Sequence, residues 1–251
     1  MYADARRFVN NHKIPMLQAE SKMQIHVIIP TLFWAILKEM GMALNIYLIR
    51  HGKTVWNIEG RLQGSGDSPL VEEGIEGAKK AGQALKAVQF SAAYSSMQKR
   101  AQDTANYILK ENETQNVPHF HHWGLNEFDF GIWEGMKSVD LYENEEYWVM
   151  KKTPAEYKAL ENGGETYEQL YQRVFKVFNQ IAELHKDNEN VLIVAHGMTL
   201  TVLTAVLKGL HWSECRDEEK HKFVMNTAIN IAKVENGKVE LVEFNNINHL
   251  V

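Results

Sequence analysis

The stretch LIRHGKTVWN, residues 48–57, places an arginine, a histidine and a glycine directly after an apolar run. A second stretch, VLIVAHGMTL at residues 191–200, repeats the arrangement with His196 and Gly197. Short runs rich in Ile, Val and Leu are typical of strands buried in a parallel sheet. Ligands bind beyond the carboxyl ends of such strands, so we expect His51 and His196 to lie close together in space.

Strand-like and helix-like segments alternate from Leu44 onward. We expect strands over 45–50, 90–96 and 190–196, helices over 72–88, 97–111 (capped by Ser95 or Ser96), 165–186 and 198–208, and a hairpin over 228–244. This alternation predicts an α/β fold with a mostly parallel central sheet and helices on both faces. The C-terminal hairpin, turning at Asn236-Gly237, adds an antiparallel edge.

Residues 112–162 have little strand pattern and many aromatic side chains, so we expect a small helical insertion over the active site. Its aromatic residues serve either as a satellite core or as a lid over a site; they are Trp123, Trp133, Trp148, Tyr142, Tyr147 and Tyr157.

Residues 1–43 differ from the domain expected over 44–251. The apolar run at 27–37 is shorter than the ~20 residues that cross a bilayer and lacks the layout of a signal peptide. Three interpretations fit these N-terminal residues: a docking helix, an interfacial anchor, or translated upstream sequence with the true start at Met42. We favour the last. We therefore expect no stable membrane insertion and a cytoplasmic location.

The chain has 251 residues, 45% of them hydrophobic and 24% charged, which is ordinary for a globular protein. Its formal net charge of -5 argues against a general nucleic-acid binder. The single cysteine, Cys215, excludes an internal disulfide. The sequence does not indicate an oligomeric state.

The residues near the two histidines suit a phosphate. Arg50 and the helix-borne Arg100 offer guanidinium groups that match phosphate oxygens, and the helix after Gly197 offers free N–H groups to an anion. Further donors lie on the loop after the first strand, at Asn57, Arg61, Gln63 and Gly64.

Six segments in this order resemble the signatures of the histidine phosphatase superfamily, also called the phosphoglycerate mutase-like family. They are RHGKTVWN (50–57), GRLQG (60–64), SSMQKRAQDTA (95–105), LNEFDFGIWEG (125–135), GGET (163–166) and VAHG (194–197). The ending NNINHL at 245–250 is also similar to the tail of many bacterial members. The resemblance covers about residues 45–250.

The resemblance implies a role for each matching residue. His51 matches the nucleophile that becomes phosphohistidine, and Glu127 matches the acid that protonates the leaving oxygen. Arg50, Arg100 and His196 match the groups that bind the phosphoryl oxygens. The residues expected to contact substrate are Gly52, Lys53, Thr54, Asn57, Arg61, Gln63, Gly64, Gly197 and Met198. The resemblance implies no metal and no cofactor.

The chemistry of these residue types agrees with those roles. A histidine attacks phosphorus only when its nitrogen is unprotonated, and neighbouring arginines lower its pKa. The same arginines stabilise the transferred phosphoryl group. A carboxyl acid near the leaving group contributes about 10²- to 10⁴-fold. Glu127 would then accept a proton from the water that attacks phosphohistidine.

Two other segments invite functional interpretations. In HFHH, residues 119–122, His119 and His121 would share one face of a strand, but nothing nearby completes a zinc site, so we interpret them as loop histidines. We interpret the charged run RDEEKHK, residues 216–222, as a solvated surface connection.

Hydrolysis of small phosphate monoesters is the favoured reaction. Mutases of the family usually carry arginines in a longer insertion. Residues 128–162 contain no arginine, and their basic side chains are all lysines: Lys137, Lys151, Lys152 and Lys158. FDFGIWEG also resembles the phosphatase branch. The alternatives are phosphoglycerate mutase-type transfer, a non-catalytic binder of phosphorylated ligands and a metal-dependent hydrolase. Candidate substrates include phosphosugars, nucleotide-derived phosphates and phosphorylated ribazole.

Overall fold

A computed structural model describes residues 43–185 and 188–251. Predictions for the N-terminal extension, including the start at Met42, lie outside the described residues. In the described part of the chain, no helix is both long enough and apolar enough to span a bilayer.

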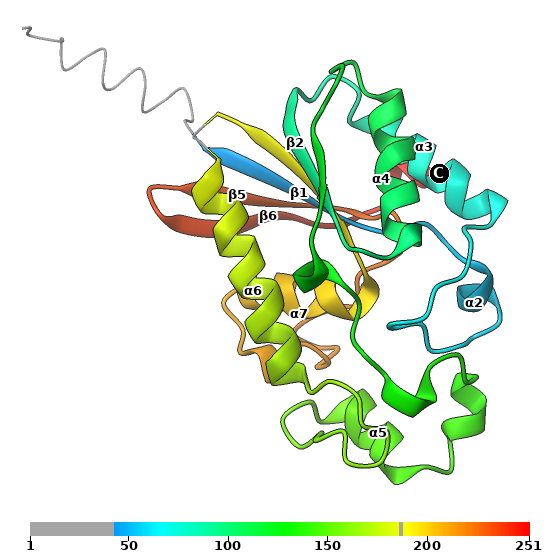
Figure 1. Cartoon of the computed structure of the whole chain (residues 1–251). Coiled ribbons are helices and arrows are strands. Elements are labelled where there is room, and N and C mark those ends of the chain that lie inside the picture. The colour runs from blue at the N-terminus through cyan, green and yellow to red at the C-terminus, as the bar shows by residue number, and fades with distance from the viewer. Residues whose placement is uncertain (1–42, 186–187) are drawn as a thin grey trace, which may run out of the picture. The chain divides into compact units, whose positions relative to one another are not determined.

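The centre of the fold is a six-stranded sheet with the order β3-β2-β4-β1-β5-β6. Strands β1, β2, β3 and β4 run parallel, and β5 and β6 form an antiparallel hairpin at one edge. This arrangement confirms the predicted α/β class (Figure 1). The bounds are β1 Leu44–Arg50, β2 Phe90–Ser95, β3 His119–His121, β4 Asn190–Ala195, β5 Ile229–Glu235 and β6 Lys238–Asn246.

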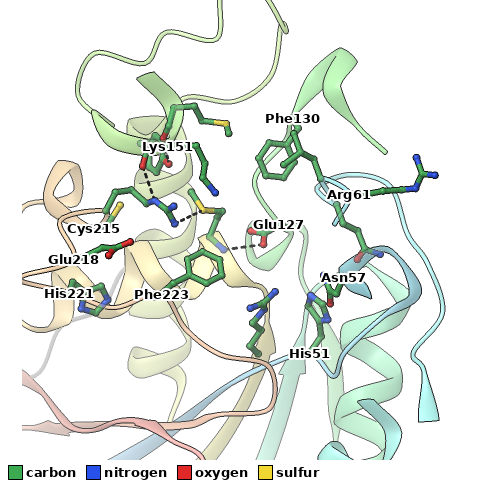
Figure 2. Close-up of a pocket in the computed structure, with 17 residues that line it drawn as sticks. His51, Asn57, Arg61, Glu127, Phe130, Lys151, Cys215, Glu218, His221 and Phe223 are labelled. Atoms are coloured by element: carbon green, nitrogen blue, oxygen red, sulfur yellow. Dashed lines mark hydrogen bonds between the residues drawn. The ribbon is translucent and has the colours of Figure 1, made fainter. Parts of the chain in front are cut away.

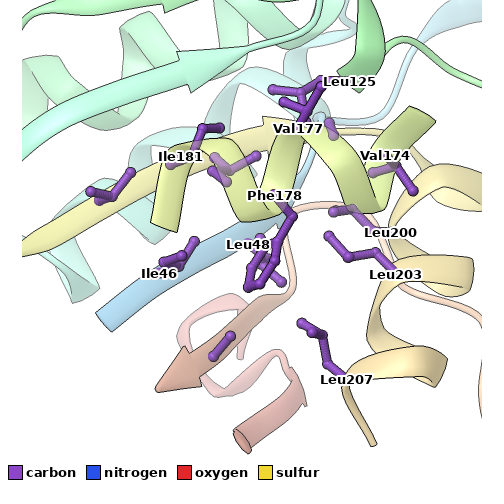
Figure 3. Packing of buried hydrophobic residues seen from close by; sticks show 14 of the residues in the cluster. Ile46, Leu48, Leu125, Val174, Val177, Phe178, Ile181, Leu200, Leu203 and Leu207 are labelled. Carbon is purple, nitrogen blue, oxygen red and sulfur yellow. The ribbon is translucent and has the colours of Figure 1, made fainter. Parts of the chain in front are cut away.

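Helices cover both faces of the sheet because side chains alternate along each strand. Ile46 and Leu48 of β1 pack against α6 (Tyr167–Leu184) and α7 (Gly197–Leu207), in the cluster that Figure 3 shows. Ile49 points to the other face and packs with α3 (Glu72–Ala84) and α4 (Lys99–Glu111). Because successive side chains of β1 point to opposite faces, the strand contributes to two hydrophobic cores, one on each face of the sheet.

Helix α7 is apolar on all sides because it is buried on all sides. Leu200 and Leu203 face the sheet, in the cluster with β1 and α6. Val202 and Ala205 face the insertion, in a second cluster with Phe128. The helix after His196 is thus held rigidly between two cores.

Helix boundaries differ from the predicted ones by a few residues. Helix α3 ends at Ala84 rather than 88. The N-cap of α4 is Gln98, so neither Ser95 nor Ser96 caps it, although Ser96 Oγ accepts from the Gln98 amide at 3.2 Å. Helix α6 begins after Thr166, which forms a capping box with Gln169.

The segment 112–162 contains β3, the edge strand that pairs in parallel with β2, which the sequence did not predict. It also contains 3₁₀ turns and the helix α5 (Glu145–Lys152). Trp133, Tyr147 and Tyr157 are buried in the second cluster, whereas Trp123 and Tyr142 are at least half exposed. Three of the six aromatic residues thus form the expected satellite core.

Candidate active site

The two histidines meet at the carboxyl ends of neighbouring parallel strands. His51 follows β1 and His196 follows β4; the His51 amide donates to the Ala195 carbonyl at 2.9 Å. Their ring centroids lie 5.1 Å apart. The side chains are 2% and 0% exposed. The structure therefore brings together residues that are 145 positions apart.

The hydrogen bond of His51 fixes its tautomer. Nδ1 lies 2.7 Å from the carbonyl oxygen of Gly52, which can only accept, so Nδ1 carries the proton. In the neutral ring the lone pair is then on Nε2. Burial lowers the pKa of His51 well below its usual 6.5, and the charges of Arg100 and Arg50 lower it further. The neutral ring that a nucleophile needs is the stable form.

His196 has a different set of partners. Its Nε2 lies 2.6 Å from Ser96 Oγ, and its buried Nδ1 has no partner among the described residues. Burial lowers its pKa well below 6.5, followed by the charges of Arg100 and then His51. Nδ1 is the atom left to contact a ligand.

Arg50 and Arg100 are fixed by groups of the protein. Arg50 Nη1 donates to the Val224 carbonyl at 3.0 Å, and burial lowers its pKa to about 10, partly offset by the charge of Glu127. Arg100 forms an ion pair with Asp67 at 3.0 Å and donates to the carbonyls of Gln63, Gly64 and Gly66.

Each of these two guanidinium groups keeps one unused buried nitrogen. Arg50 Nε and Arg100 Nε, like His196 Nδ1, have no hydrogen-bond partner in the described part of the chain. Buried donors are normally satisfied. These three nitrogens belong to residues that lie close enough for the two arginines to lower the pKa of His196. Three unsatisfied buried nitrogens in one place indicate a site for an oxyanion.

Glu127 occupies the N-terminus of α7. Its Oε1 accepts from the amides of Phe128 and Thr199 and from the Thr199 hydroxyl, and its Oε2 accepts from the Met198 amide at 3.0 Å. The sequence predicted that these helix amides would bind the substrate's anion. They bind the protein's own carboxylate instead, which places Glu127 in the pocket with one Oε2 lone pair free.

Arg173 of α6 fixes the segment that carries Glu127, and the sequence did not indicate it. Its guanidinium pairs with Glu165 at 2.6 Å and donates to the carbonyls of Gly124, Asn126 and Glu127. The GGET segment belongs to this arrangement through Glu165. The role of Arg173 becomes visible only in the tertiary structure, where α6 contacts the loop that carries Glu127.

The loop residues divide into two groups. Asn57, Arg61, Gln63 and Met198 line the pocket. Several others are held by the protein and lie outside its lining: Lys53 pairs with Glu73 at 2.8 Å, the Thr54 hydroxyl donates to Gln63, the Gly52 amide donates to Thr104, and the Gly64 amide donates to Glu134.

Gly52 and Gly197 are required by close packing within the protein. A Cβ on Gly52 would lie 2.4 Å from the Gly74 carbonyl oxygen, and one on Gly197 would lie 2.6 Å from the Phe223 ring. Contacts this short force the backbone or ring to move. Gly52 and Gly197 were expected to contact substrate, but the structure shows that the missing side chain makes room for other parts of the chain.

The pocket is a cavity of about 240 Å³ with Arg50, His51 and Glu127 in its lining. Figure 2 shows His51, Asn57 and Arg61 on one side, and Lys151, Cys215, Glu218 and His221 on the other. Phe223, Phe130 and Glu127 lie between the two sides. His196 and Arg100 are buried and are not among the described lining residues, but the His196 ring lies 5.1 Å from that of His51 and the charge of Arg100 acts on His51.

The run 216–222 is not simply a solvated connection. Arg216, Glu218 and His221 line the pocket, and His221 is 2% exposed. The interpretation as surface was wrong because charge density along the sequence does not show which side chains turn inward. Arg216 thus brings a guanidinium to the pocket from outside the insertion.

The remaining candidates have structural partners. Of the described lining residues, the segment 112–162 contributes Glu127, Phe130, Met150 and Lys151, and none of the six aromatic residues considered as a lid. The interpretation of His119 and His121 as loop histidines was wrong, because both lie in β3. They share one strand face, and both contact Ser95 Oγ, at 3.0 and 2.9 Å. No group of three or more His, Cys, Asp or Glu side chains suited to a metal occurs among the described residues.

Comparison with known proteins identifies the family. Residues 46–247 match the model of the histidine phosphatase superfamily, branch 1, so the chain belongs to this superfamily. The resemblance of the six segments is thereby confirmed.

Relatives include both mutases and phosphatases by name. A 2,3-bisphosphoglycerate-dependent phosphoglycerate mutase from Beijerinckia indica is 34% identical over 171 residues, covering 66% of this chain and 81% of that protein. YhfR from Bacillus stearothermophilus has a TM-score of 0.76 at 29% identity, covering 83% and 100%. A putative α-ribazole-5'-P phosphatase from Escherichia coli has a TM-score of 0.71 at 28% identity, covering 82% and 97%.

Proposed function

We propose that this chain is a metal-independent phosphatase that hydrolyses small phosphate monoesters through a phosphohistidine on His51. The observation that carries the proposal is the Nδ1–Gly52 carbonyl bond of 2.7 Å, which leaves the Nε2 lone pair on a neutral, pocket-lining ring. A small phosphorylated metabolite in the cytoplasm is the substrate this proposal implies.

Two steps complete the reaction. In the first, Glu127 reacts in its protonated form, with the proton on Oε2. His51 Nε2 bonds to phosphorus while the P–O bond to the leaving group breaks, and Glu127 gives this proton to the leaving oxygen. In the second, water attacks phosphohistidine, Glu127 takes the proton, and inorganic phosphate leaves. Arg50 Nε, Arg100 Nε and His196 Nδ1 supply donors for the phosphoryl oxygens in both steps.

Phosphoryl transfer between the hydroxyls of phosphoglycerate is the second candidate. The name of the Beijerinckia indica relative and the arginine that reaches the pocket favour it. The absence of arginine from residues 128–162 favours hydrolysis. Incubation with 3-phosphoglycerate separates the two: a mutase produces 2-phosphoglycerate, and a phosphatase releases inorganic phosphate.

An aryl phosphate assay tests the proposal directly. We expect turnover of 4-nitrophenyl phosphate that is unchanged by EDTA and lost in His51→Ala. Sensitivity to EDTA would indicate a metal-dependent hydrolase, and phosphate binding without turnover would indicate a non-catalytic binder. A panel of phosphosugars, nucleotide-derived phosphates and phosphorylated ribazole then identifies the best substrate.

A further inference from the structure

The pocket has a second positively charged end that the proposed chemistry does not use. Arg216 and Lys151 line the cavity in addition to the cations near His51. In Figure 2, Lys151 and His51 lie on opposite sides of the pocket, with Glu127 and Phe223 between them. A group bound at Lys151 is therefore a different part of the ligand from the phosphoryl group at His51.

Arg216 is fixed by neutral partners. Its Nε donates to the Lys151 carbonyl at 3.2 Å, and its Nη1 lies 3.8 Å from the thioether sulfur of Met198. Its guanidinium carbon lies 5.3 Å from the centroid of the Phe223 ring. These contacts hold the guanidinium in place without neutralising its charge.

Lys151 is a partly buried ammonium beside that guanidinium. Burial lowers its pKa, the charge of Arg216 lowers it further, and the charge of Glu218 acts in the opposite direction. Within the described residues, neither cation has a carboxylate within the 4.0 Å of an ion pair. Two unpaired cations at one wall of a cavity are costly unless an anion joins them.

The Phe223 ring lies near an arginine from each of the two charged ends of the pocket. The guanidinium carbon of Arg50 lies 5.2 Å from its centroid, close to the corresponding distance for Arg216. Both ends therefore lie within the reach of one small ligand. Phe130 also stands between the two sides, so the middle of the cavity suits an apolar body such as a ring.

We propose that Arg216 and Lys151 bind a second anionic group of the substrate, a carboxylate or a second phosphate, at the end opposite the transferred phosphoryl group. The inference rests on the proposed phosphatase function and specifies its substrate class: phosphate monoesters with a compact apolar body and a distal negative charge. Glu218, on the same wall, repels an anion, but it is one negative charge against the two positive charges of Arg216 and Lys151.

Three aryl phosphates test the subsite: phenyl phosphate, 4-carboxyphenyl phosphate and 1,4-phenylene bisphosphate. We measure kcat/KM for each with wild type, Arg216→Gln and Lys151→Gln. We expect wild type to prefer one or both anionic probes over phenyl phosphate, and Arg216→Gln to reduce that preference about 10-fold, because a charge-assisted hydrogen bond is lost. The probe with the larger preference distinguishes a carboxylate from a phosphate.

A neighbouring lysine supplies the matched control. Lys152 is exposed, and its Nζ lies 4.9 Å over the Trp148 ring, outside the described lining of the pocket. Lys152→Gln removes the same charge from the next residue, so we expect it to leave the probe preference unchanged. Arg216→Lys, which retains a positive charge, should retain part of the preference and serves if Arg216→Gln does not fold.

Calorimetry with the same probes separates failure of the subsite from failure of the phosphatase proposal. His51→Ala and its double variant with Arg216→Gln give dissociation constants without turnover. An equal loss for all three probes, or no anion preference in wild type, would overturn the subsite even if hydrolysis is observed. An absence of hydrolysis with an Arg216-dependent preference in binding would overturn the phosphatase and keep the subsite.

Discussion

The ends of β1 and β4 have the same local design and different chemical environments. In each, an apolar parallel strand is followed by histidine and glycine. His51 bonds to its neighbour's carbonyl through Nδ1 and lines the pocket, whereas His196 bonds to Ser96 through Nε2 and is fully buried. The same device therefore produces a ring suited to attack in one place and a ring suited to binding in the other.

The backbone amides after the two histidines also have different partners. The Gly52 amide donates to Thr104 of α4, whereas the amides of Met198 and Thr199 hold the carboxylate of Glu127. In the proposed mechanism, one strand end supplies the nucleophile, and the other supplies a donor and the support for an acid. These partners are Thr104 of α4, Ser96 directly after β2, and Glu127 of the segment 112–162.

Replacing each histidine in turn has the largest expected effect. We expect His51→Ala to lower kcat by about 10⁴-fold or more, because the attacking atom is lost. We expect His196→Ala to lower it about 10²- to 10³-fold, because one donor to the phosphoryl group is lost. Quenching at alkaline pH, where phosphohistidine is stable, should trap labelled phosphohistidine in His196→Ala and not in His51→Ala. The reverse labelling would exchange their roles.

The acid held by α7 should matter most for poor leaving groups. We expect Glu127→Gln to slow hydrolysis of alkyl phosphates by about 10²- to 10⁴-fold and to affect 4-nitrophenyl phosphate much less, because nitrophenolate leaves without protonation. Rates across phenols of graded acidity measure this difference. Equal loss for every leaving group would contradict the role as an acid.

Acidification should destabilise the fold, because several of its histidines have lowered pKa values and stay neutral in the folded state. The folded pKa values of His51 and His196 lie well below 6.5. Those of His119 and His221 are about 4, so all these rings stay neutral when the unfolded chain takes up protons. Stability should therefore fall as pH drops below about 6.5, by about 1.4 kcal/mol per pH unit for each histidine. Thermal melts between pH 7 and 5 measure this slope. His221→Gln should reduce it, and an unchanged slope would contradict the pKa shift of that residue.

The serine partner of His196 should have the smallest effect. We expect Ser96→Ala to lower kcat/KM roughly fivefold, in keeping with the loss of about 1 kcal/mol for one hydrogen bond. Ser95→Ala is the control, because Ser95 contacts His119 and His121 instead. If both variants behave like wild type, the 2.6 Å bond does not position His196.

The sequence predicted the elements whose patterns are long. The strands β1 and β4, the helices α6 and α7 and the hairpin over β5 and β6 were recognised within a few residues. The strand β3 has only three residues, too few for a period of two to appear. Its place in the sheet depends on pairing with β2.

The site was predicted where residues follow the ends of strands or match ordered family segments. His51, His196, Arg50 and Arg100 lie together, as expected. Arg173 and Arg216 were missed, since neither follows a predicted strand or lies in a recognised segment. Their hydrogen-bond partners are 8 to 65 positions away in the sequence.

The sequence by itself determined the order of strands and helices, the burial of the strands and the arrival of both histidines at one edge of the sheet. Apolar periodicity specifies these features, because burying those side chains is the main driving force of folding. The tertiary structure alone decided which nitrogen of each histidine is free, that α7 holds Glu127 and that Arg216 turns into the pocket. The Nδ1 bond of His51 is to the adjacent residue, but the others join residues that are far apart in the sequence: His196 with Ser96, Glu127 with the amides of α7, and Arg216 with Lys151 and Met198. No local pattern encodes those contacts.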